Sequence, residues 1–370
     1  MRIEIHTQLD DEIQKFWSDL EDRSNLGPFQ SFGWVKHWLS TVGLPVYDIE
    51  VFVVCIFVNE HIEAILPMGI VKKNKFSKLE WLGGIHCDYM GPLVAEDSIF
   101  FYSNFNSIWR EVLTALPKID VVSFRNQPLK LGSQNNPFCS MRHSREYSNS
   151  YQANFEGSWS QFKGSISKKV LNDSIRQRKR LSSLGILKFV VLDKSEDKSL
   201  FYKKFFAFKS FRYAEMGVED ILKPKEHKDF YLGMPESINK FTSVHCAALM
   251  LDDEIIALHW GVIQKKTFYY LMPANSSGKW SKYSPGKLLL EELLFWCHEN
   301  KISIFDFTSG DEMYKKIWTN ASLSLINTLT PITLKGYIYV LLENLKLYLE
   351  KTPFIRSMIK KLYENLRGYI

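Results

Sequence analysis

The stretch TFYYLMPANSSGKWSKYSPGKLLLEELLFWCHEN, residues 267–300, decides the fold of this chain. It predicts a β-strand that ends near Leu271-Met272, then a polar loop rich in Ser, Gly and Lys, then a strongly apolar helix that begins at Ser284-Pro285-Gly286. Proline is favoured in the first turn of a helix, because its missing N–H is not needed there. A strand, a loop and a helix in this order are typical of an α/β fold.

The start of this helix is a candidate anion site. The first turn of a helix leaves backbone N–H groups without partners, and the helix dipole is positive at that end. A strand–loop–helix junction with glycine therefore suits a pyrophosphate. Lys279, Lys282 and Lys287 add positive charge nearby. Many ordinary helices also begin with Ser-Pro and carry lysines, so an ordinary helix start is the alternative.

The next strand, in IFDFTSGDEMYKKIW (304–318), carries an acid inside an apolar run. The pleat of a strand directs Asp306 to the face opposite its two neighbouring phenylalanines. A carboxylate placed there either faces a cleft or is held by hydrogen bonds. Asp311 follows in a turn, and Tyr314 and Lys315 come next. These last residues either line a pocket or simply begin a helix.

Two parts of the chain resemble each other. Residues 53–73 and 244–266 each read as an apolar strand, a short acidic turn, a second strand and a Lys-Lys pair, which predicts two antiparallel hairpins. A predicted helix and then a strand that begins with Lys-Ile follow each hairpin, in 103–124 and in 286–307. Such a repeat predicts two related α/β domains. A chance likeness between hairpins is the alternative.

Two further helical regions are predicted. Residues 159–184 read as one basic amphipathic helix with Ile166, Val170, Leu181 and Leu184 on one face. Beyond residue 330 the chain predicts two more amphipathic helices, separated by Pro353. The first is marked by apolar residues at helical spacing, and the second lies around 359–366. The residues that mark the first are Leu334, Ile338, Leu341, Leu345 and Leu349. Apolar stripes of this kind usually pack on a partner helix, and contact with a membrane surface is the alternative.

Length and composition limit the class of protein. A chain of 370 residues with 45 % hydrophobic and 24 % charged residues predicts a folded protein of two domains. Its net charge of +6 suits a protein that handles phosphates, but it does not indicate DNA. Part of this charge is local, because residues 331–370 hold seven Lys or Arg against three Glu.

The cysteines and the N-terminus indicate a cytoplasmic location. The five cysteines lie far apart without a CxxC pair, so zinc or thioredoxin-like chemistry has no support. Cys55 and Cys246 sit in apolar runs and are expected to be reduced core residues. The first residues are too polar for a signal peptide, and no window of 18 apolar residues predicts a transmembrane span.

Several motifs together resemble the double-domain GNAT acyltransferases. These motifs are YSPGKLLLE (283–291) and FDF-x-x-G-D-x-x-YKK (305–316) in the second half, and PFQS (28–31) followed by Trp34 in the first. Leu82-Gly83-Gly84 followed by Asp88-Tyr89 resembles the family's first-domain loop, and 167–185 resembles its inter-domain helix. The resemblance covers about residues 15–320. The family includes cellulose-biosynthesis-associated acetyltransferases and is similar to the Fem peptidoglycan aminoacyltransferases.

The resemblance implies a mixed α/β fold with tandem GNAT-like domains and an active site between them. Each domain is then a mixed, mostly antiparallel sheet flanked by helices. Residues 1–150 would form the acceptor-side domain, residues 151–330 the acyl-CoA domain, and residues 331–370 a basic amphipathic helical tail. The usual GNAT pyrophosphate loop is replaced here by Lys282–Lys287. The residues expected to hold acyl-CoA are Leu271, Met272, Lys279, Lys282, Tyr283, Ser284, Gly286 and Lys287.

The reaction implied by the family is direct attack of an amine on a thioester. A strand amide near Met272 would polarise the carbonyl. A base, or water in its place, must take the proton of the amine, and Asp306 and His259 are the candidates. For both residues a structural role in the core is the alternative. The residues expected to bind the acceptor are Asp88, Tyr89, Asp311, Tyr314 and Lys315. No metal is expected.

The acceptor is expected to be an amino sugar, linked to a nucleotide and used for a bacterial surface polysaccharide such as O-antigen or capsule. Two alternatives stay open. One is a Fem-type transferase that uses aminoacyl-tRNA, although no heptad run interrupts 186–330. The other is a non-catalytic membrane-surface or assembly component, since the tail is basic and amphipathic. Neither the acyl chain nor the oligomeric state follows from the sequence.

Overall fold

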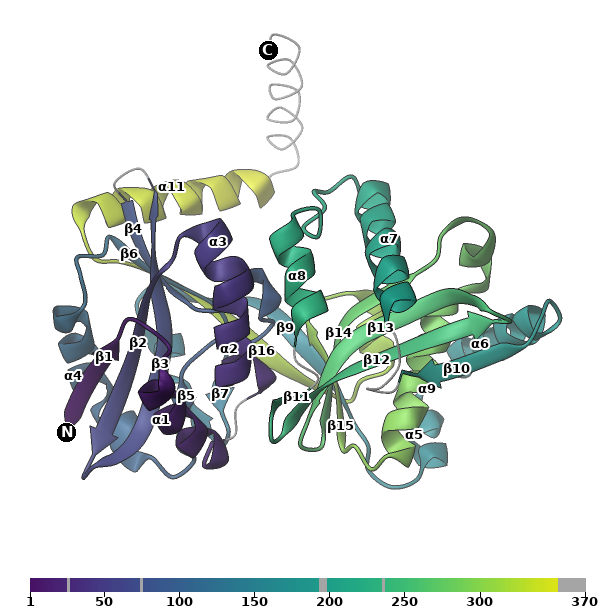
Figure 1. The fold of residues 1–370 in the computed structure, drawn as a ribbon, viewed down its shortest axis with the longest axis horizontal. Coiled ribbons are helices and arrows are strands. Elements are labelled where there is room, and N and C mark those ends of the chain that lie inside the picture. Colours follow the sequence, from purple (N-terminus) through teal and green to yellow (C-terminus); the bar gives the residue numbers. More distant parts are fainter. Residues whose placement is uncertain (25–26, 74–75, 193–197, 235–236, 352–370) are drawn as a thin grey trace, which may run out of the picture.

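The computed structural model describes residues 1–24, 27–73, 76–192, 198–234 and 237–351. Its centre is one large mixed sheet whose strand order is β1-β2-β3-β4-β6-β16-β9-β15-β14-β13-β12-β10. Most neighbouring strands are antiparallel, whereas β4 and β6 are parallel, as are β14 and β15. Helices cover the sheet (Figure 1). The mixed α/β class and the mostly antiparallel sheet predicted from the sequence are therefore confirmed.

The first half of the chain forms one end of this sheet. Its strands are β1 (Arg2–His6), β2 (Glu50–Val58), β3 (His61–Lys73), β4 (Phe76–Trp81), β5 (Leu93–Val94), β6 (Val121–Pro128), β7 (Lys130–Leu131) and β8 (Gln134–Asn135). Its helices are α1 (Asp11–Asp22), α2 (Phe32–Trp38), α3 (Leu44–Tyr47) and α4 (Ile99–Ala115).

The second half forms the other end. Its strands are β9 (Ser144–Asn154), β10 (Leu187–Val191), β11 (Ser237–Asn239), β12 (Thr242–Leu251), β13 (Glu254–Gln264), β14 (Thr267–Asn275), β15 (Ile304–Ser309) and β16 (Ala321–Pro331). Its helices are α5 (Trp159–Ser165), α6 (Lys168–Ser182), α7 (Ser199–Met216), α8 (Lys225–Gly233), α9 (Pro285–Glu299), α10 (Met313–Ile317) and α11 (Leu334–Lys351).

Both predicted hairpins are present and occupy corresponding places. β2 pairs with β3 around Val54↔Leu66, and β12 pairs with β13 around Ala247↔His259. The residues of these strands are largely buried, because helices pack on the sheet, and this explains their nearly continuous apolar sequence. The predicted helices and strands that follow are α4 with β6 and α9 with β15.

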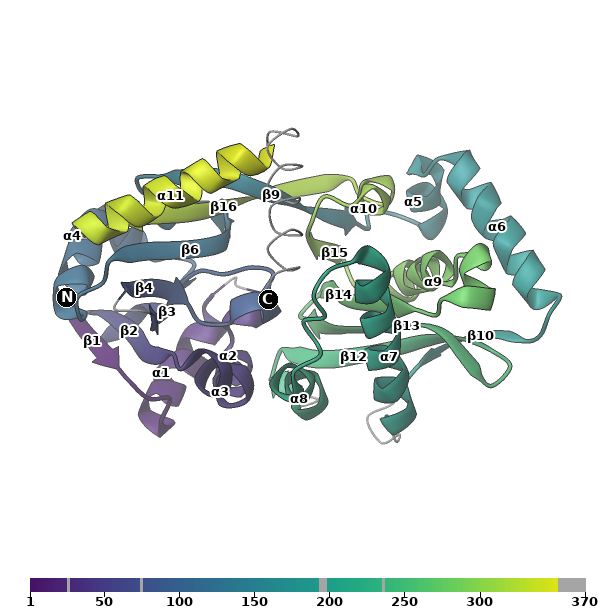
Figure 2. The ribbon, with the colours of Figure 1, turned by 90° about the horizontal axis from the view of Figure 1, so that it is seen from above.

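Two strands join the halves into one sheet. β9 pairs with β15 of the second half, and β16 lies between β9 and β6 of the first half. Figure 2 shows β9 and β16 running from one half to the other beneath α11. The predicted boundary near residue 150 therefore falls inside β9, and the proposed division into domains stays a prediction.

The predicted helix over 159–184 is wrong in one respect, because it is broken. Ile166 has an extended backbone (φ −87°, ψ 139°) between α5 and α6. Gly164 and Ser165 just before it are weak helix formers, and the side chain of Ile166 is buried in the core. Leu184 is exposed instead of buried with Leu181, because α6 ends at Ser182 and Leu184 lies beyond it.

The predicted first tail helix is present as α11, which contacts β16 along the first half. The sequence favoured packing of its apolar stripe on a partner helix, and the structure does not show this packing. Leu334, Ile338, Leu341 and Leu345 are exposed. Pro353 and the second predicted tail helix, 359–366, lie outside the described residues. Across the described part of the chain, no helix combines the length and apolar character needed to cross a bilayer.

Candidate active site

Asp306 lies near the end of β15 and faces away from the core beneath α9. Phe305 and Phe307, on either side of it, contact Tyr270 in that core. The alternation of a β-strand therefore points the carboxylate of Asp306 to the other face of the sheet, where it meets Tyr89. This orientation is the one predicted from the sequence. It places an acid where the two halves of the chain meet.

The carboxylate of Asp306 is buried and accepts three hydrogen bonds. The donors are the hydroxyl of Tyr89 at 2.6 Å, the amide of Gln152 at 2.8 Å and the backbone N–H of Thr308 at 2.7 Å. Burial raises the pKa of Asp306 to about 6, although the hydrogen bonds favour the charged form. A carboxyl group that titrates this close to neutrality can accept a proton and release it again, as a general base requires.

The backbone at Thr308 is strained. Its φ is 57°, in the left-handed region that a β-branched residue rarely adopts. The same position interrupts the pairing of β15 with β9, between Asp306 and Ser309. The resulting bulge turns the Thr308 N–H toward the carboxylate of Asp306. Strain of this kind concentrates at functional sites, because the surrounding structure must hold it in place.

The first half contributes Asp88 and Tyr89 from the loop between β4 and β5. The loop turns at Gly83, whose φ of 121° suits glycine and where a Cβ would lie 2.2 Å from Cys87 Sγ. The buried Tyr89 spans the junction to Asp306, while Asp88 is half-buried. Burial raises the pKa of Asp88, against the effect of its hydrogen bond with Thr308. Asp88 from the first half and Asp306 from the second therefore both form a hydrogen bond with Thr308.

The PFQS motif holds this loop from behind. The buried amide of Gln30 donates a 2.6 Å hydrogen bond to the backbone oxygen of Tyr89. The ring of Phe29 makes edge contacts with Tyr89, Trp34 and Tyr269. Residues of a motif near position 30 thus fix the loop near position 89, and they do not reach the carboxylates themselves.

Two lysines face the acids. Lys315 on α10 is buried, and it donates to the backbone oxygen of Ser309 at 2.5 Å and to Glu312 at 3.0 Å. Lys209 on α7 is half-buried near Asp88 and Glu312. Burial lowers the pKa of Lys209 to about 8, although these two acids favour its charged form. The site thus combines two acids with two cations, one of which has a pKa close to neutrality.

The strands β14 and β15 separate next to this cluster. They pair in parallel from Thr267↔Ile304 to Tyr269↔Asp306, and no described pair follows. β14 continues to Asn275 beside β13, whereas β15 turns to β9. The half-buried Leu271 and Met272 follow the last pair. Backbone groups of β14 on that side are consequently available to a ligand.

The first turn of α9 follows β14 and a short helical turn, 278–283. Pro285 is its first residue, as predicted, and Ser284 before it has a left-handed backbone with φ 52°. A Cβ on Gly286 would lie 3.1 Å from the side-chain oxygen of Asn275, so the chain is close-packed here. The free N–H groups of this first turn and the positive end of the helix dipole suit a phosphate.

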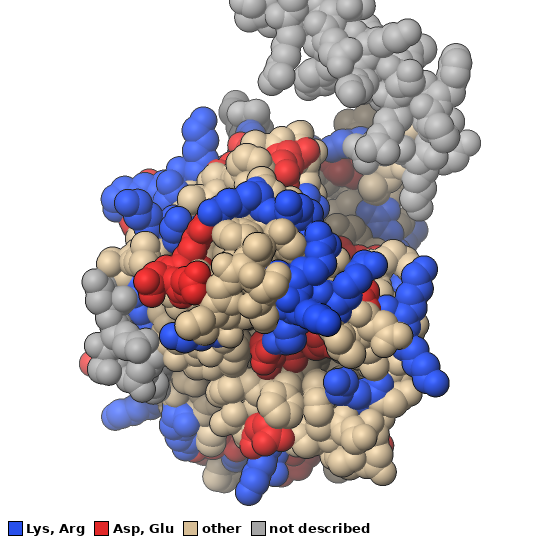
Figure 3. All heavy atoms as spheres, turned by 90° about the vertical axis from the view of Figure 1, so that its right-hand side faces the viewer, with Lys and Arg blue, Asp and Glu red and all other residues tan. Residues whose placement is uncertain are grey.

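The three predicted lysines Lys279, Lys282 and Lys287 make different contacts in the structure. Lys279 pairs with Glu254 at 2.9 Å, and Lys287 pairs with Asp173 of α6 at 2.9 Å. Lys282 instead lies over the ring of Tyr283, as does Arg180 of α6. Figure 3 shows Lys and Arg gathered on the face of the molecule that carries α6. Lys282 and Arg180 are the cations best placed to meet an anion at the start of α9.

His259 is not part of the acid cluster. It is fully buried on the α9 side of the sheet, parallel to the ring of Tyr270 at 4.6 Å and close to Phe268. Burial lowers its pKa well below the usual range. Asp306 points to the opposite face, so the structure does not bring the two candidate bases together. Neither ring nitrogen of His259 has a hydrogen-bond partner among the described residues.

The remaining predicted acceptor residues lie around α10. Asp311 accepts a 2.8 Å hydrogen bond from Tyr151 in an exposed position. Tyr314 is partly exposed, and its ring meets the edge of Phe307. Only Lys315 of this group reaches the cluster around Asp306 and Asp88.

A pocket of about 520 Å³ opens on the first half next to the site. Met90 and Ser309 line it, and they directly follow Tyr89 and Thr308 of the cluster. Its other walls come mainly from α2, α3, β3, β4, β6, β9, β16 and α11. They are rich in aromatic and charged side chains, namely Trp38, Tyr47, Trp81, Phe124, Tyr147, Tyr339, Lys78, Glu80, Arg125, Arg145 and Glu343. A polar, aromatic pocket thus leads away from the two acids.

Sequence reasoning missed Lys209, Gln152 and Thr308. Lys209 is one of several lysines in an aromatic-rich stretch, and no spacing distinguishes it from Lys203 or Lys204. Gln152 lies on β9, where only the pairing with β15 brings it beside Asp306. Thr308 is important through its backbone conformation. A β-branched residue directly before Ser-Gly at a strand end was the only available signal.

The chain is similar to known proteins in sequence over part of its length and in fold over most of it. Residues 168–316 match the family described as an acetyltransferase (GNAT) domain. Among solved structures, FemX is similar over 92 % of this chain and 100 % of its own, with a TM-score of 0.61 and 10 % identity. L-PGS from Bacillus licheniformis is similar over 91 % of this chain and 98 % of its own, with a TM-score of 0.50 and 12 % identity.

A putative lysylphosphatidylglycerol synthetase C-terminal domain from Agrobacterium fabrum also has a TM-score of 0.50, at 11 % identity over 89 % of this chain and 94 % of its own. No curated protein matches. At such low identity the similarity to these structures shows the fold alone. The GNAT match shows the class of domain that residues 168–316 form. The protein is therefore an acyltransferase with a GNAT acetyltransferase domain. Its fold is the double-domain GNAT fold, similar to that of the Fem proteins.

Proposed function

We propose that the protein moves an acyl group from acyl-CoA to the amino group of a nucleotide-linked amino sugar that is used for a surface polysaccharide. One observation carries the proposal. Asp88 and Tyr89 of the first half meet Asp306 and Thr308 of the second, between the separating strands and the pocket. A donor and an acceptor that approach from these two directions meet at the acids. On this proposal residues 1–150 serve the acceptor and residues 151–330 the donor.

The donor side suits acyl-CoA. The first turn of α9, with Lys282 and Arg180 beside it, would hold the pyrophosphate. The backbone of Leu271 and Met272 would hold the pantetheine arm and the acyl carbonyl. Acyl-CoA supplies the thioester carbonyl that the amine attacks, and its thiol leaves. Acyl-CoA is a cytoplasmic metabolite, so a cytoplasmic location would follow.

The chain's own residues would manage the proton. At pH 7 a carboxyl with a pKa of about 6 is mostly ionised, so Asp306 can take the proton that the amine must lose. Tyr89 and Gln152 hold the carboxylate in one orientation. The side chain of Asp88 would pair with the ammonium form of the acceptor before that proton is lost. Holding the two substrates in line supplies much of the remaining acceleration.

The pocket suits an acceptor with a ring system and negative charge. Trp38, Tyr47 and Tyr147 offer aromatic surfaces to a base or a sugar. Arg125 and Arg145 offer guanidinium groups to a diphosphate. The pocket ends at Met90 and Ser309, so an amino group at the end of such a ligand would face the acids.

A second candidate is transfer from aminoacyl-tRNA. The similarity to FemX over the whole fold and the basic face around α6 favour it. The acids and the pocket would then act on an aminoacyl ester in place of a thioester. The two candidates differ in the donor and share the site.

Thermal unfolding with donors and acceptors separates these candidates. A ligand that binds the native state raises the midpoint of unfolding. We expect a rise with CoA and acyl-CoA and a further rise when a nucleotide amino sugar is added. A rise with charged tRNA, and none with any CoA species, would favour the second candidate. If no CoA species and no tRNA raised the midpoint, the proposal for α9 would fail.

A further inference from the structure

Helix α11 has two apolar sides, and only one of them packs on the protein. The inner side is fixed by Gly336, where a Cβ would lie 1.9 Å from the backbone oxygen of Asp120. Val340 is buried, and Tyr339 contacts the ring of Phe76 at 4.7 Å. This close approach sets the rotation of the helix. If the helix rotated, a residue with a side chain would take the place of Gly336 and clash with the backbone of Asp120. The opposite side of the helix therefore stays outward.

The outer side is an apolar strip. Leu334, Ile338, Leu341 and Leu345 follow each other at helical spacing, and they are 78 %, 55 %, 68 % and 51 % exposed. We call these four residues the α11 strip. A helix that is apolar all round is normally covered on every side. Contiguous exposed apolar residues of this kind indicate a surface that binds something.

The charge next to the strip indicates its partner. Lys335 and Lys346 lie on the same helix and are exposed. The remaining sequence, 352–370, adds four Lys or Arg against one Glu. Glu343 of the same helix lines the pocket instead. An anionic lipid surface complements both the apolar strip and the lysines beside it.

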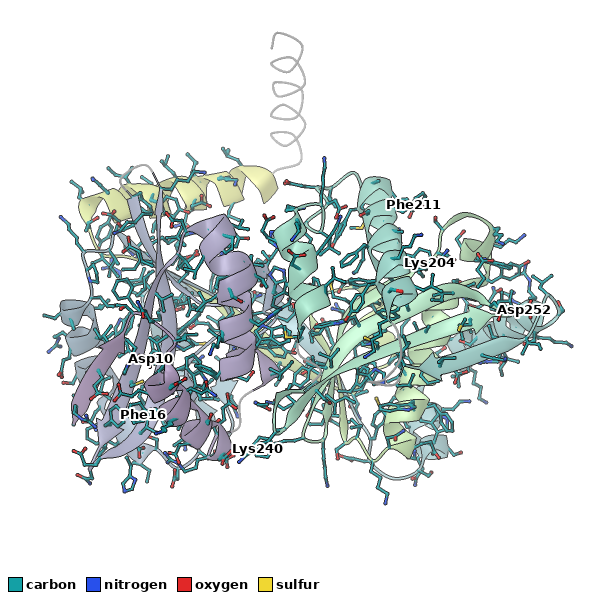
Figure 4. All side chains as sticks on the ribbon, viewed as in Figure 1. Asp10, Phe16, Lys204, Phe211, Lys240 and Asp252 are labelled. Atoms are coloured by element: carbon teal, nitrogen blue, oxygen red, sulfur yellow. The ribbon has the colours of Figure 1, made fainter. Side chains whose placement is uncertain are left out.

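Other exposed apolar residues lie on the same side of the molecule. α3, α11 and the C-terminal end of α7 lie along the upper side of Figure 1. Leu44 of α3 and Phe211 and Met216 of α7 are about half exposed. Phe211 is labelled near the upper end of α7 in Figure 4. A flat surface that touches the α11 strip would face these residues as well.

We propose that α11 docks this protein on an anionic membrane surface through the α11 strip, with Lys335 and Lys346 of the same helix beside it. The helix is also a wall of the pocket, through Tyr339, Glu343 and Leu347. Docking therefore holds the pocket at the membrane surface. The inference concerns binding alone and does not depend on the donor or the acceptor of the reaction.

Co-sedimentation of the full-length protein with vesicles tests this inference. We expect binding to phosphatidylglycerol–phosphatidylcholine vesicles, much weaker binding to phosphatidylcholine alone, and release by salt. The variant I338E/L341E/L345E should reduce partitioning about tenfold or more, because it removes the apolar contact and adds negative charge. Thermal unfolding of the variants checks that they are folded.

A matched control replaces three exposed apolar residues at the other end of the molecule. I175E/L184E/I186E changes side chains that are 62 %, 52 % and 63 % exposed and adds the same charge. It should sediment like the wild type. Wild-type protein that stays in the supernatant with both kinds of vesicle would overturn the inference, as would equal loss in both triple variants. A dimer that I338E/L341E/L345E dissociates, without vesicle binding, would show that a second copy covers the strip.

Discussion

At the residue scale, the environment of Asp306 sets it apart from Asp311, which lies close to it in the chain. Three donors hold it in one orientation, while burial keeps its pKa near 6. Asp311, only five residues away, is exposed and accepts a hydrogen bond from Tyr151. Two aspartates close in the chain thus lie in different environments, one inside the junction and the other on the surface.

Replacing Asp306 tests its role as a base. D306N should lower kcat by about 100-fold or more, because a neutral amide cannot accept the proton of the amine. Binding of CoA, measured by thermal shift, should change little, since the acid lies beside the donor site and not at the start of α9. D311N is the matched control and should keep most of its activity. Normal turnover of D306N would remove this residue from the mechanism.

The pH profile carries a second test at this scale. A base works when it is deprotonated, so activity should rise as pH increases through about 6. The hydroxyl of Tyr89 favours the charged form of Asp306, and its removal raises the pKa further. In Y89F the rising limb should therefore shift to higher pH. If the rising limb of the Y89F profile lay at the same pH as in the wild type, the pKa of Asp306 would not determine the pH dependence.

Asp306 and Tyr89 were named from the sequence, whereas Gln152 and Lys209 were not. An acid between two phenylalanines in a strand has its face set by the pleat, so Asp306 could be placed from local pattern alone. Gln152 and Lys209 reach the site through strand pairing and helix packing across 154 and 97 residues of chain. His259 had an equally apolar setting, but the structure places it on the other face of the sheet.

At the element scale, the first turn of α9 is the part that the donor proposal needs most. Replacing the two cations over Tyr283, in R180A/K282A, should weaken CoA binding about tenfold, since two charges near the pyrophosphate are lost. Two other cations also share one aromatic ring, Lys240 and Lys265 over Phe241. K240A/K265A is therefore the matched control, and Lys240 lies at the lower edge of the molecule in Figure 4. Equal affinity of both double variants would argue against this site.

Elements with a strong local pattern were predicted well, and those set by packing were not. The hairpins β2–β3 and β12–β13 carry long apolar runs with a turn between them, so their existence followed from the sequence. The break between α5 and α6 was missed because Ile166 continues the helical spacing while its backbone is extended. The strip on α11 was expected to pack, but the contact at Gly336 turns it outward.

At the scale of the whole molecule, β9 and β16 tie the two halves together. β16 pairs with β9 from Ala321 to Thr328 and with β6 from Leu325 to Pro331. Neither half can lose its central strand without exposing the edge of the other. We therefore expect a single calorimetric transition with no ligand present. Two separate transitions would show that the halves unfold independently.

The site exists only in this joined arrangement. Asp88 and Tyr89 come from one half, Asp306 and Lys315 from the other, and the hydrogen bond between Tyr89 and Asp306 spans the junction. Neither half alone carries the whole cluster of acids and lysines. The repeat in the sequence indicated two related halves, but the shared strands and the pocket between β4, β6, β16 and α11 needed the structure.

The most direct test of the account is product analysis with the full-length protein. Wild-type protein and D306N are incubated with acyl-CoA and a panel of nucleotide amino sugars, and free thiol and product mass are measured. We expect the wild type to release thiol and to form one acylated amino sugar, and D306N to form far less. No thiol and no product with any acyl-CoA, together with transfer from charged tRNA, would contradict the proposed donor and support the second candidate.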